Sequence, residues 1–219
     1  MTTVDLHPSA PGYHPPAELL LDHAVGGRTE AEALLIDLHL SMCPDCREAA
    51  GVCDSVGGAL LDAIEPTRLP PGLLNRTLAA IETESPTRPT ERGADNALRI
   101  DPDEGPWNTF PGGIAVRQLS VGGGNERFLL MRVPAGRSVL RHRHKGDEWT
   151  VVLRGGFSDE MGSYRVGDFV LRHAGDEHRP IAEPAEDCVC LTLIRDGLSY
   201  PGLAGLAFRA LLRLKGGSL

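Results

Sequence analysis

The hydrophobic pattern of this chain changes close to its midpoint, and that change limits the possible folds more than any other feature. Residues 15–84 carry apolar side chains at helical spacing, whereas short runs rich in Val, Leu, Phe and Thr follow later between glycines. Residues 85–97 are polar, contain prolines and lack apolar periodicity, which is typical of a linker. We therefore expect a multidomain α + β protein, with helical residues 1–84, the linker, and a β domain over residues 98–219.

Local signals divide the first half into four helices. The run PPAELLLDHAVGG begins with prolines, which a first helical turn tolerates, and ends on two glycines. Thr29 and Glu32 form a capping-box pattern at the start of a second helix. Pro44 suits the first position of a third helix, which makes Cys43 its N-cap. LLNRTLAAIET predicts a fourth, amphipathic helix whose apolar face consists of Leu74, Leu78 and Ile81.

The second half has the pattern of an all-β domain. Runs such as ERFLLMRV, EWTVVLRG and CVCLTLIR recur at spacings of about 8 to 12 residues with turn signals between them, which favours a sandwich or barrel. The final run, GLAGLAFRALLRL, predicts a C-terminal helix that docks its apolar stripe on the barrel. That stripe consists of Leu203, Leu206, Ala210, Leu211 and Leu214.

Charge and cysteine content exclude several classes of protein. A net charge of −8 and a pI near 5.5 argue against direct binding to nucleic acid as the main activity. No apolar run approaches the ~18 residues that a membrane span needs, and the N-terminus lacks the basic and apolar regions of a signal peptide. We therefore expect a cytoplasmic protein. Five cysteines make a poor disulfide framework and a better metal or thiol pattern.

The octapeptide HLSMCPDC gathers three metal-ligand side chains in residues 39–46. If Cys43 caps a helix, Cys46 lies in its first turn, where the helix dipole and free N–H groups favour the thiolate that zinc requires. His39, at the end of the preceding helix, can reach across the turn. The expected metal is zinc. A redox pair is an alternative, although no βαβ pattern surrounds the motif, and two core cysteines are another.

A fourth zinc ligand must come from elsewhere in the chain. The candidates are His7, His14, His23 and Cys53. His14 precedes the first helix, and a short antiparallel helix pair would bring it near the end of the second helix. His23 lies at the opposite end of the first helix, which places it too far away. Cys53 follows Cys46 by about two helical turns and is expected to be a small core residue.

Residues 11–84 resemble the zinc-binding anti-sigma family. The resemblance rests on the helix order, on the run HLSMCPDCREAAGVCDSVGGALLD, and on a histidine 25 residues upstream of His39. It implies a small helical bundle that binds zinc through His14, His39, Cys43 and Cys46. It also implies a protein partner, an extracytoplasmic-function sigma factor.

A second metal-ligand group lies in the β half. In GRSVLRHRHKGDEWTVVLRG, His142 and His144 point to the same face of a strand and Glu148 follows, while GDFVLRHAGDEHRP supplies His178. Three imidazoles and a carboxylate suit Zn, Mn, Fe or Ni. These two motifs resemble the two-motif signature of the cupin barrel, a double-stranded β-helix or jelly roll.

The second motif departs from the common cupin pattern at two positions. His173 stands where the family usually has proline, and it is either a loop histidine or an extra histidine near the site. Ala182 stands where asparagine is frequent, which removes a polar group. Cys188 and Cys190 share one face of a late strand, where they either line the barrel near the metal or fill a core.

The combination of both halves resembles the ChrR-type anti-sigma factors over nearly the whole chain. The resemblance implies a regulator, not an enzyme, whose helical domain inserts between the two domains of the sigma factor. It also implies a cupin domain that is needed for release of sigma under oxidative stress, from singlet oxygen or organic hydroperoxide. The alternatives are a metal-dependent cupin enzyme, such as a dioxygenase with an accessory helical module, and a zinc-scaffolded binding module without a sigma partner.

Overall fold

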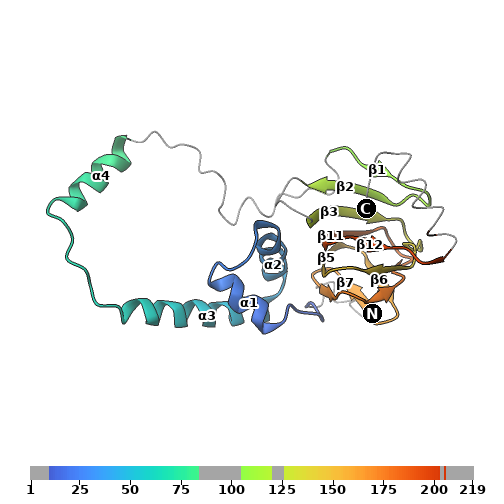
Figure 1. Cartoon of the computed structure of the whole chain (residues 1–219), viewed down its shortest axis with the longest axis horizontal. Helices are drawn as coiled ribbons and strands as arrows, with labels where there is room; N and C mark the ends of the chain where they lie inside the picture. The colour runs from blue at the N-terminus through green and yellow to red at the C-terminus, as the bar shows by residue number, and fades with distance from the viewer. Residues whose placement is uncertain (1–9, 84–104, 120–125, 203–204, 206–219) are drawn as a thin grey trace, which may run out of the picture.

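A computed structural model describes residues 10–83, 105–119, 126–202 and 205 of the 219-residue chain (Figure 1). The whole expected linker and most of the expected C-terminal helix therefore lie outside the described residues, as does His7. Within the described part, four helices precede a domain of antiparallel strands, as the hydrophobic pattern predicts.

The helices are α1 (Ala17–Ala24), α2 (Glu30–Met42), α3 (Pro44–Asp62) and α4 (Leu73–Thr83). The predicted capping box is confirmed, because the Thr29 N–H donates to Glu32 Oε2 at 2.8 Å and the Glu32 N–H donates to Thr29 Oγ1 at 3.3 Å. Cys43 is the N-cap of α3, as predicted, and its Sγ accepts a hydrogen bond from the Cys46 N–H at 3.5 Å. None of the described helices is long and apolar enough to span a membrane.

The described strands form one six-stranded and two three-stranded sheets, and every pair is antiparallel. The large sheet has the order β1-β2-β3-β11-β5-β8, and the small ones β10-β6-β7 and β12-β4-β9. Their bounds are β1 Asn108–Thr109, β2 Ala115–Leu119, β3 Glu126–Val133, β4 His142–His144, β5 Glu148–Arg154, β6 Gly156–Asp159, β7 Gly162–Arg165, β8 Phe169–Arg172, β9 Glu177–His178, β10 Ile181–Ala182, β11 Cys188–Arg195 and β12 Leu198–Ser199.

Strand β11 is buried on both faces, which explains why its sequence, CVCLTLIR, is an almost unbroken apolar run. Cys188 and Cys190 face the barrel interior, where they pack with side chains such as Phe157. The alternating side chains, represented by Leu191, belong to a different core cluster that includes the α2 residue Leu35. The large sheet is therefore covered on its outer face by helix.

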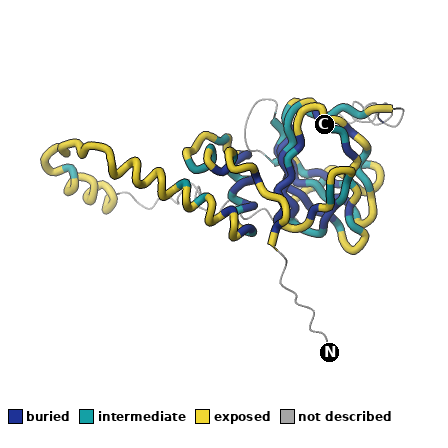
Figure 2. The backbone as a smooth tube through the Cα atoms, turned by 90° about the horizontal axis from the view of Figure 1, so that it is seen from below, coloured by how far each residue is buried: buried dark blue, intermediate teal, exposed yellow. Residues whose placement is uncertain are grey.

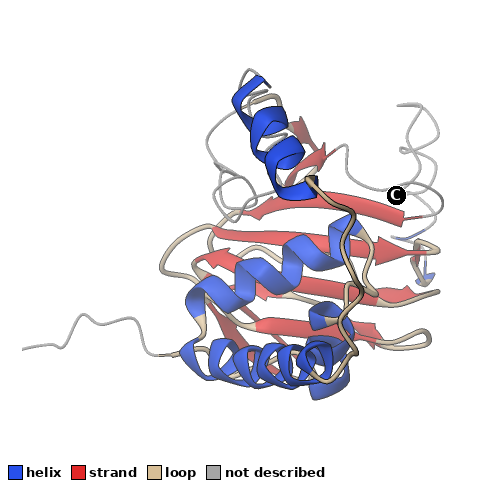
Figure 3. Ribbon diagram, turned by 90° about the vertical axis from the view of Figure 1, so that its left-hand side faces the viewer, coloured by secondary structure: helices blue, strands red, loops and turns tan. Residues whose placement is uncertain are grey.

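Helix α2 provides that cover. It contacts β5 and β11, and its Leu35 and Ile36 side chains are fully buried against the sheet (Figure 3). At the edge of this contact Arg195 donates to Glu32 Oε1 at 2.6 Å and to Glu126 Oε1 at 2.8 Å. The first two helices thus share a core with the barrel and do not bury their apolar faces in a separate bundle. The 3.6-residue period predicts such a face but cannot identify what it packs against.

The later helices extend away from this core. Of the residues in α3 and α4, only Cys46 is buried (Figures 1 and 2). Nine large apolar side chains between residues 52 and 81 are at least 50% exposed, and we call this segment the apolar arm. They are Val52, Val56, Leu60, Leu61, Ile64, Leu69, Leu74, Leu78 and Ile81. Apolar surface of this extent on a soluble protein marks an interaction site.

Candidate metal centres

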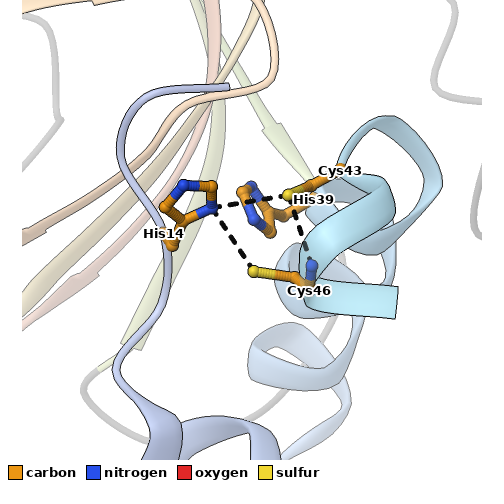
Figure 4. A group of neighbouring side chains, drawn as sticks. All are labelled: His14, His39, Cys43 and Cys46. Carbon is orange, nitrogen blue, oxygen red and sulfur yellow. Dashed lines mark hydrogen bonds between the residues drawn. The ribbon is translucent and has the colours of Figure 1, made fainter. Parts of the chain in front are cut away.

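The four predicted N-terminal ligands lie together, with one ligand atom from each within 4.8 Å of the others (Figure 4). His39 comes from the last turn of α2, Cys43 and Cys46 from the start of α3, and His14 from the segment that precedes α1. His14 Nδ1 is 3.4 Å from the Sγ atom of each cysteine. We call these four residues the N-terminal cluster.

The donor atoms of the N-terminal cluster fit a tetrahedral zinc ion. Zinc bonds of about 2.3 Å to sulfur and 2.0 Å to nitrogen, at tetrahedral angles, would place the sulfur and the nitrogen about 3.5 Å apart. His39 Nδ1 donates to the Gly167 carbonyl at 2.7 Å, which leaves the Nε2 lone pair free. That Nε2 atom is buried and has no hydrogen-bond partner in the described part of the chain. A metal-binding histidine is typically oriented in this way.

Burial opposes ionisation of the Cys46 thiol. The pKa of Cys46 is raised to about 12, mainly because the thiol is buried and also because it is hydrogen-bonded to Cys43. This burial acts against the thiolate that the start of α3 is expected to favour at Cys46. An ion that replaces the thiol proton would supply the missing stabilisation of the thiolate and would cross-link α2, α3 and the segment before α1.

Two other candidates for the fourth ligand, His23 and Cys53, lie outside the N-terminal cluster. His23 Nε2 is 2.9 Å from Asp37 Oδ1, which raises the pKa of His23, and this pair lies outside the N-terminal cluster. Cys53 is half-buried on α3, so the expectation that it is a core residue is wrong, because the later turns of α3 pack against little else. The five cysteines are all free.

A second group forms inside the barrel from His142 and His144 on β4 and His178 on β9. His142 and His178 are register partners of adjacent strands, which brings motifs 36 residues apart to the same point. All three side chains are buried. His178 Nε2 lies 2.9 Å from His142 Nε2 and 3.0 Å from His144 Nε2. We call these three residues the barrel cluster.

The hydrogen bonds of the barrel cluster are suited to a cation at its centre. His142 Nδ1 donates to the Leu140 carbonyl at 2.8 Å, and His178 Nδ1 donates to Asp159 Oδ2 at 2.7 Å. Both Nε2 atoms therefore present lone pairs to each other, which is repulsive unless a positive charge lies between them. Nitrogens bound at right angles about 2.1 Å from one ion would lie about 3.0 Å apart.

A proton on His142 or His144 would not supply that positive charge near pH 7. Burial lowers the pKa of His142 to about 4 and that of His144 to about 3, so both rings are neutral near pH 7. The residues present thus fit a divalent ion, and the donor set does not distinguish zinc from manganese, iron or nickel.

Two further residues of the cupin motifs lie near the barrel cluster without joining it. Glu148, the predicted fourth ligand, begins β5, and its Oε2 is 3.8 Å from His144 Nδ1. Burial raises the pKa of Glu148. The His173 side chain is 67% exposed and pairs with Asp147 at 3.3 Å, so it is a loop histidine. Its imidazole is not part of the barrel cluster.

The motif analysis missed the residues that orient His178. Asp159 Oδ2 accepts from His178 Nδ1 and, at 2.8 Å, from Arg172 Nη2, which also donates to the Tyr164 hydroxyl at 2.6 Å. Burial alone would raise the pKa of Asp159, but hydrogen bonds from His178 and Arg172 hold it well below its usual range. These side chains come from β6, β7 and β8, and no local pattern in the sequence marks them.

The two cysteines of β11 satisfy both of the predicted alternatives. Cys188 and Cys190 are buried, and their Sγ atoms are 3.4 Å apart. Both also line a cavity inside the barrel that His142 and His178 border. The hydrogen bond with Cys188 and burial raise the pKa of Cys190, which favours its thiol form.

Comparison with known proteins identifies relatives over most of this chain. Residues 95–195 match the family model described as the ChrR cupin-like domain. The anti-sigma-E factor ChrR of Cereibacter sphaeroides is 35% identical over 193 residues, which cover 82% of this chain and 87% of that protein. A chain of the crystal structure of Rhodobacter sphaeroides SigE in complex with the anti-sigma ChrR superposes with a TM-score of 0.72 at 34% identity. That match covers 83% of this chain and 98% of the other.

Removal of single ligands should separate the two centres. We expect about two metal ions per purified chain, one fewer in His39→Ala because the N-terminal cluster loses an imidazole, and one fewer in His178→Ala. Elemental analysis by mass spectrometry measures these ratios. His173→Ala is the matched control and should keep both ions. A single ion in the unmodified chain, or two in His39→Ala, would contradict the assignment of the N-terminal cluster.

Proposed function

The chain belongs to the ChrR family of anti-sigma factors, and we propose that it binds and inhibits an extracytoplasmic-function sigma factor. The ChrR protein in the SigE complex is a relative over nearly its whole length, which supports a sigma factor as the partner of this chain too. On this proposal the chain is a regulator rather than an enzyme, and it acts in the cytoplasm, where its partner works.

The apolar arm is the observation that carries this proposal. It begins directly after the N-terminal cluster and exposes nine large apolar side chains along α3, the following segment and α4. Helices with such exposed apolar faces gain most of their stability from tertiary contacts, which the described part of the chain does not supply for α4. A sigma factor that covers the arm would bury this surface and would itself be withheld from RNA polymerase.

The N-terminal cluster would fix the direction in which the arm leaves the barrel. Cys43 and Cys46 occupy the first turn of α3, so an ion held there would anchor that helix to His14 and His39. Zinc is the ion that two thiolates and two imidazoles favour. We propose residues 1–84 as the inhibitory part, residues 85–97 as the linker, and residues 98–219 as a cupin sensor.

The sensor function is the finer part of the proposal. All eight predicted ligands would take part: His14, His39, Cys43 and Cys46 in the first centre, and His142, His144, His178 and Glu148 in the second. The barrel centre would hold zinc, manganese, iron or nickel, and its modification under oxidative stress would release the sigma factor. Cys188 and Cys190, which line the adjacent cavity, lie within reach of the same oxidants.

A substitution in the apolar arm tests the inhibitory interface. The full chain should co-elute with an extracytoplasmic-function sigma factor from its own organism and suppress sigma-dependent transcription in vitro. Leu74→Glu should weaken that binding at least about tenfold, because a charge would be buried against the partner. Val25→Glu is the matched control, because Val25 is 73% exposed and lies outside the arm. This variant should bind the sigma factor like the unmodified chain. Undiminished transcription at saturating chain would refute inhibition.

A substitution in the barrel cluster tests the sensor. His178→Ala should still inhibit the sigma factor in untreated cells but should no longer release it after exposure to singlet oxygen or an organic hydroperoxide, as measured by a sigma-dependent reporter. His173→Ala should respond like the unmodified chain. Loss of inhibition by folded His178→Ala before any oxidant is added would mean that the barrel itself holds the sigma factor.

A further inference from the structure

A cavity of about 190 Å³ lies inside the barrel beside the barrel cluster. Its wall is mainly apolar and includes Val116, Leu129, Met131, Phe157 and Ile194. The imidazoles of His142 and His178 border the same space. A cavity of about 150 Å³ lined by aliphatic and aromatic side chains accommodates benzene, so this one has room for a molecule of about one aromatic ring.

The polar groups of the cavity define the kind of molecule that fits. No lysine, arginine or aspartate belongs to the described residues that line it, and Glu148 is the sole carboxylate among them. Ala182, which replaces the asparagine frequent in cupins, places a buried methyl group on the wall. The apolar part of a ligand would therefore contact apolar side chains over most of the cavity. A donor atom of the ligand would face the imidazoles of the barrel cluster.

We propose that this cavity binds a small, largely apolar molecule with a single oxygen donor that faces the barrel cluster. A cationic head group is excluded because it would approach the ion that the cluster would hold. A sugar-like ligand is excluded because its many hydroxyl groups would outnumber the few polar side chains of the wall, which besides the imidazoles and the two cysteines are Glu148, Thr150, Thr192 and Tyr200. The site is independent of the sigma-binding arm.

Single-ring probes test this ligand site on the full, metal-loaded chain. Titration calorimetry should show binding of benzyl alcohol, at least about tenfold weaker binding of toluene because it lacks the oxygen, and no binding of benzylammonium. Ala182→Leu should weaken benzyl alcohol binding at least about tenfold, because the larger side chain fills the cavity.

The neighbouring residue provides a matched control. Ile181 belongs to the same strand, β10, but is 41% exposed, so Ile181→Leu should bind the probes like the unmodified chain. Melting temperature and metal content identify variants that have not folded. Equal affinity for benzylammonium and benzyl alcohol would overturn the proposal, as would unchanged binding in folded Ala182→Leu.

A separate set of contacts attaches residues 10–14, which we call the strap, to the barrel. The Gly12 and Tyr13 N–H groups donate to Asp168 Oδ1 at 2.6 and 3.1 Å, and the Phe169 N–H donates to the Tyr13 carbonyl at 2.9 Å. Asp168 is buried, and its other oxygen accepts from the Arg165 N–H at 2.8 Å. One carboxylate thus fixes both the strap and the turn between β7 and β8.

Two glycines of the barrel make room for the strap. A Cβ atom at Gly162 would lie 2.5 Å from the Tyr13 hydroxyl, and one at Gly167 would lie 2.8 Å from Pro11 Cγ. Gly167 also has a φ angle of +89°, which residues other than glycine rarely adopt. The barrel surface is therefore shaped for this segment.

The strap and its turn position both imidazoles of the N-terminal cluster. His14 follows Tyr13 directly, and His39 donates from Nδ1 to the carbonyl of Gly167, the residue before Asp168. The two cysteines come from α3 instead. Half of the ligand set is thus oriented by the barrel and half by the helix that begins the arm.

Contacts also lead from this strap to the barrel cluster. Arg172 joins the Asp159 carboxylate, which holds His178, to the Tyr164 hydroxyl. The ring of Tyr164 lies 4.7 Å from that of Tyr13, between centroids. Contacts therefore run from His178 of the barrel cluster through Asp159, Arg172 and Tyr164 to Tyr13. Tyr13 directly precedes His14 of the N-terminal cluster.

We infer that Asp168 is a positioning residue for the N-terminal metal, and that the Asp159–Arg172–Tyr164 series couples its retention to the barrel cluster. This inference rests on the proposed metal binding of the N-terminal cluster. Loss of the strap contacts would free His14 and tilt His39, which removes orientation that metal-bound imidazoles need. A change at the barrel cluster would thereby loosen the anchor of the apolar arm.

The rate of zinc transfer to a chromogenic chelator tests this coupling in the full chain. His39→Ala should lack the phase of the N-terminal cluster, and His178→Ala should lack the phase of the barrel cluster. These two variants therefore assign each kinetic phase to its centre. Asp168→Asn should speed the N-terminal phase at least about tenfold, because an amide cannot accept at both atoms. Tyr164→Phe should speed the same phase by a smaller factor.

A second capping carboxylate serves as the control. Asp187 Oδ1 accepts from the Ala135 N–H at 3.0 Å away from the strap, so Asp187→Asn should leave both phases unchanged. An unchanged N-terminal phase in Asp168→Asn would overturn the inference. Absence of an N-terminal phase from the unmodified chain is a different result, since it would refute the proposed zinc site itself.

Discussion

The buried imidazole of His39 has two partners on opposite sides, and the arrangement of the molecule depends on both. Its Nδ1 donates to the carbonyl of Gly167 in the barrel, and its Nε2 faces the sulfurs at the start of α3 and has no hydrogen-bond partner among the described residues. The hydrogen bond sets the tautomer that makes Nε2 a ligand. An ion bound there would connect the barrel, the second helix and the base of the apolar arm through one side chain.

The apolar side chains also divide the molecule into a packed body and an exposed extension. Strand β11 buries one face inside the barrel and the other beneath α2, so the barrel and the first two helices form one packed body. Beyond Cys46 no residue of α3 or α4 is buried, and most of their large apolar side chains are exposed. A buried body with an exposed apolar extension suits a protein whose stable part senses and whose extension binds. The N-terminal cluster lies where the extension leaves the packed body, and the barrel cluster lies inside that body.

The sequence predicted those features that depend on neighbouring residues or on one strand. The N-cap role of Cys43, the capping box at Thr29 and the shared face of His142 and His144 follow from local spacing, and all are confirmed. The contacts of Asp159 and Asp168 were not predictable, because each joins segments 13 or more residues apart without a motif. The raised pKa of Cys46 was also missed, since helix position is local whereas desolvation depends on the whole fold.

Zinc-edge X-ray absorption on the sigma-bound complex tests the central claim most directly. His178→Ala chain loaded with one zinc is the appropriate sample, because its signal then arises from the N-terminal cluster alone. The account predicts two sulfur ligands at about 2.3 Å and two nitrogen ligands at about 2.0 Å. A zinc shell without sulfur, or a disulfide between Cys43 and Cys46 in a chain that still holds its partner, would contradict it.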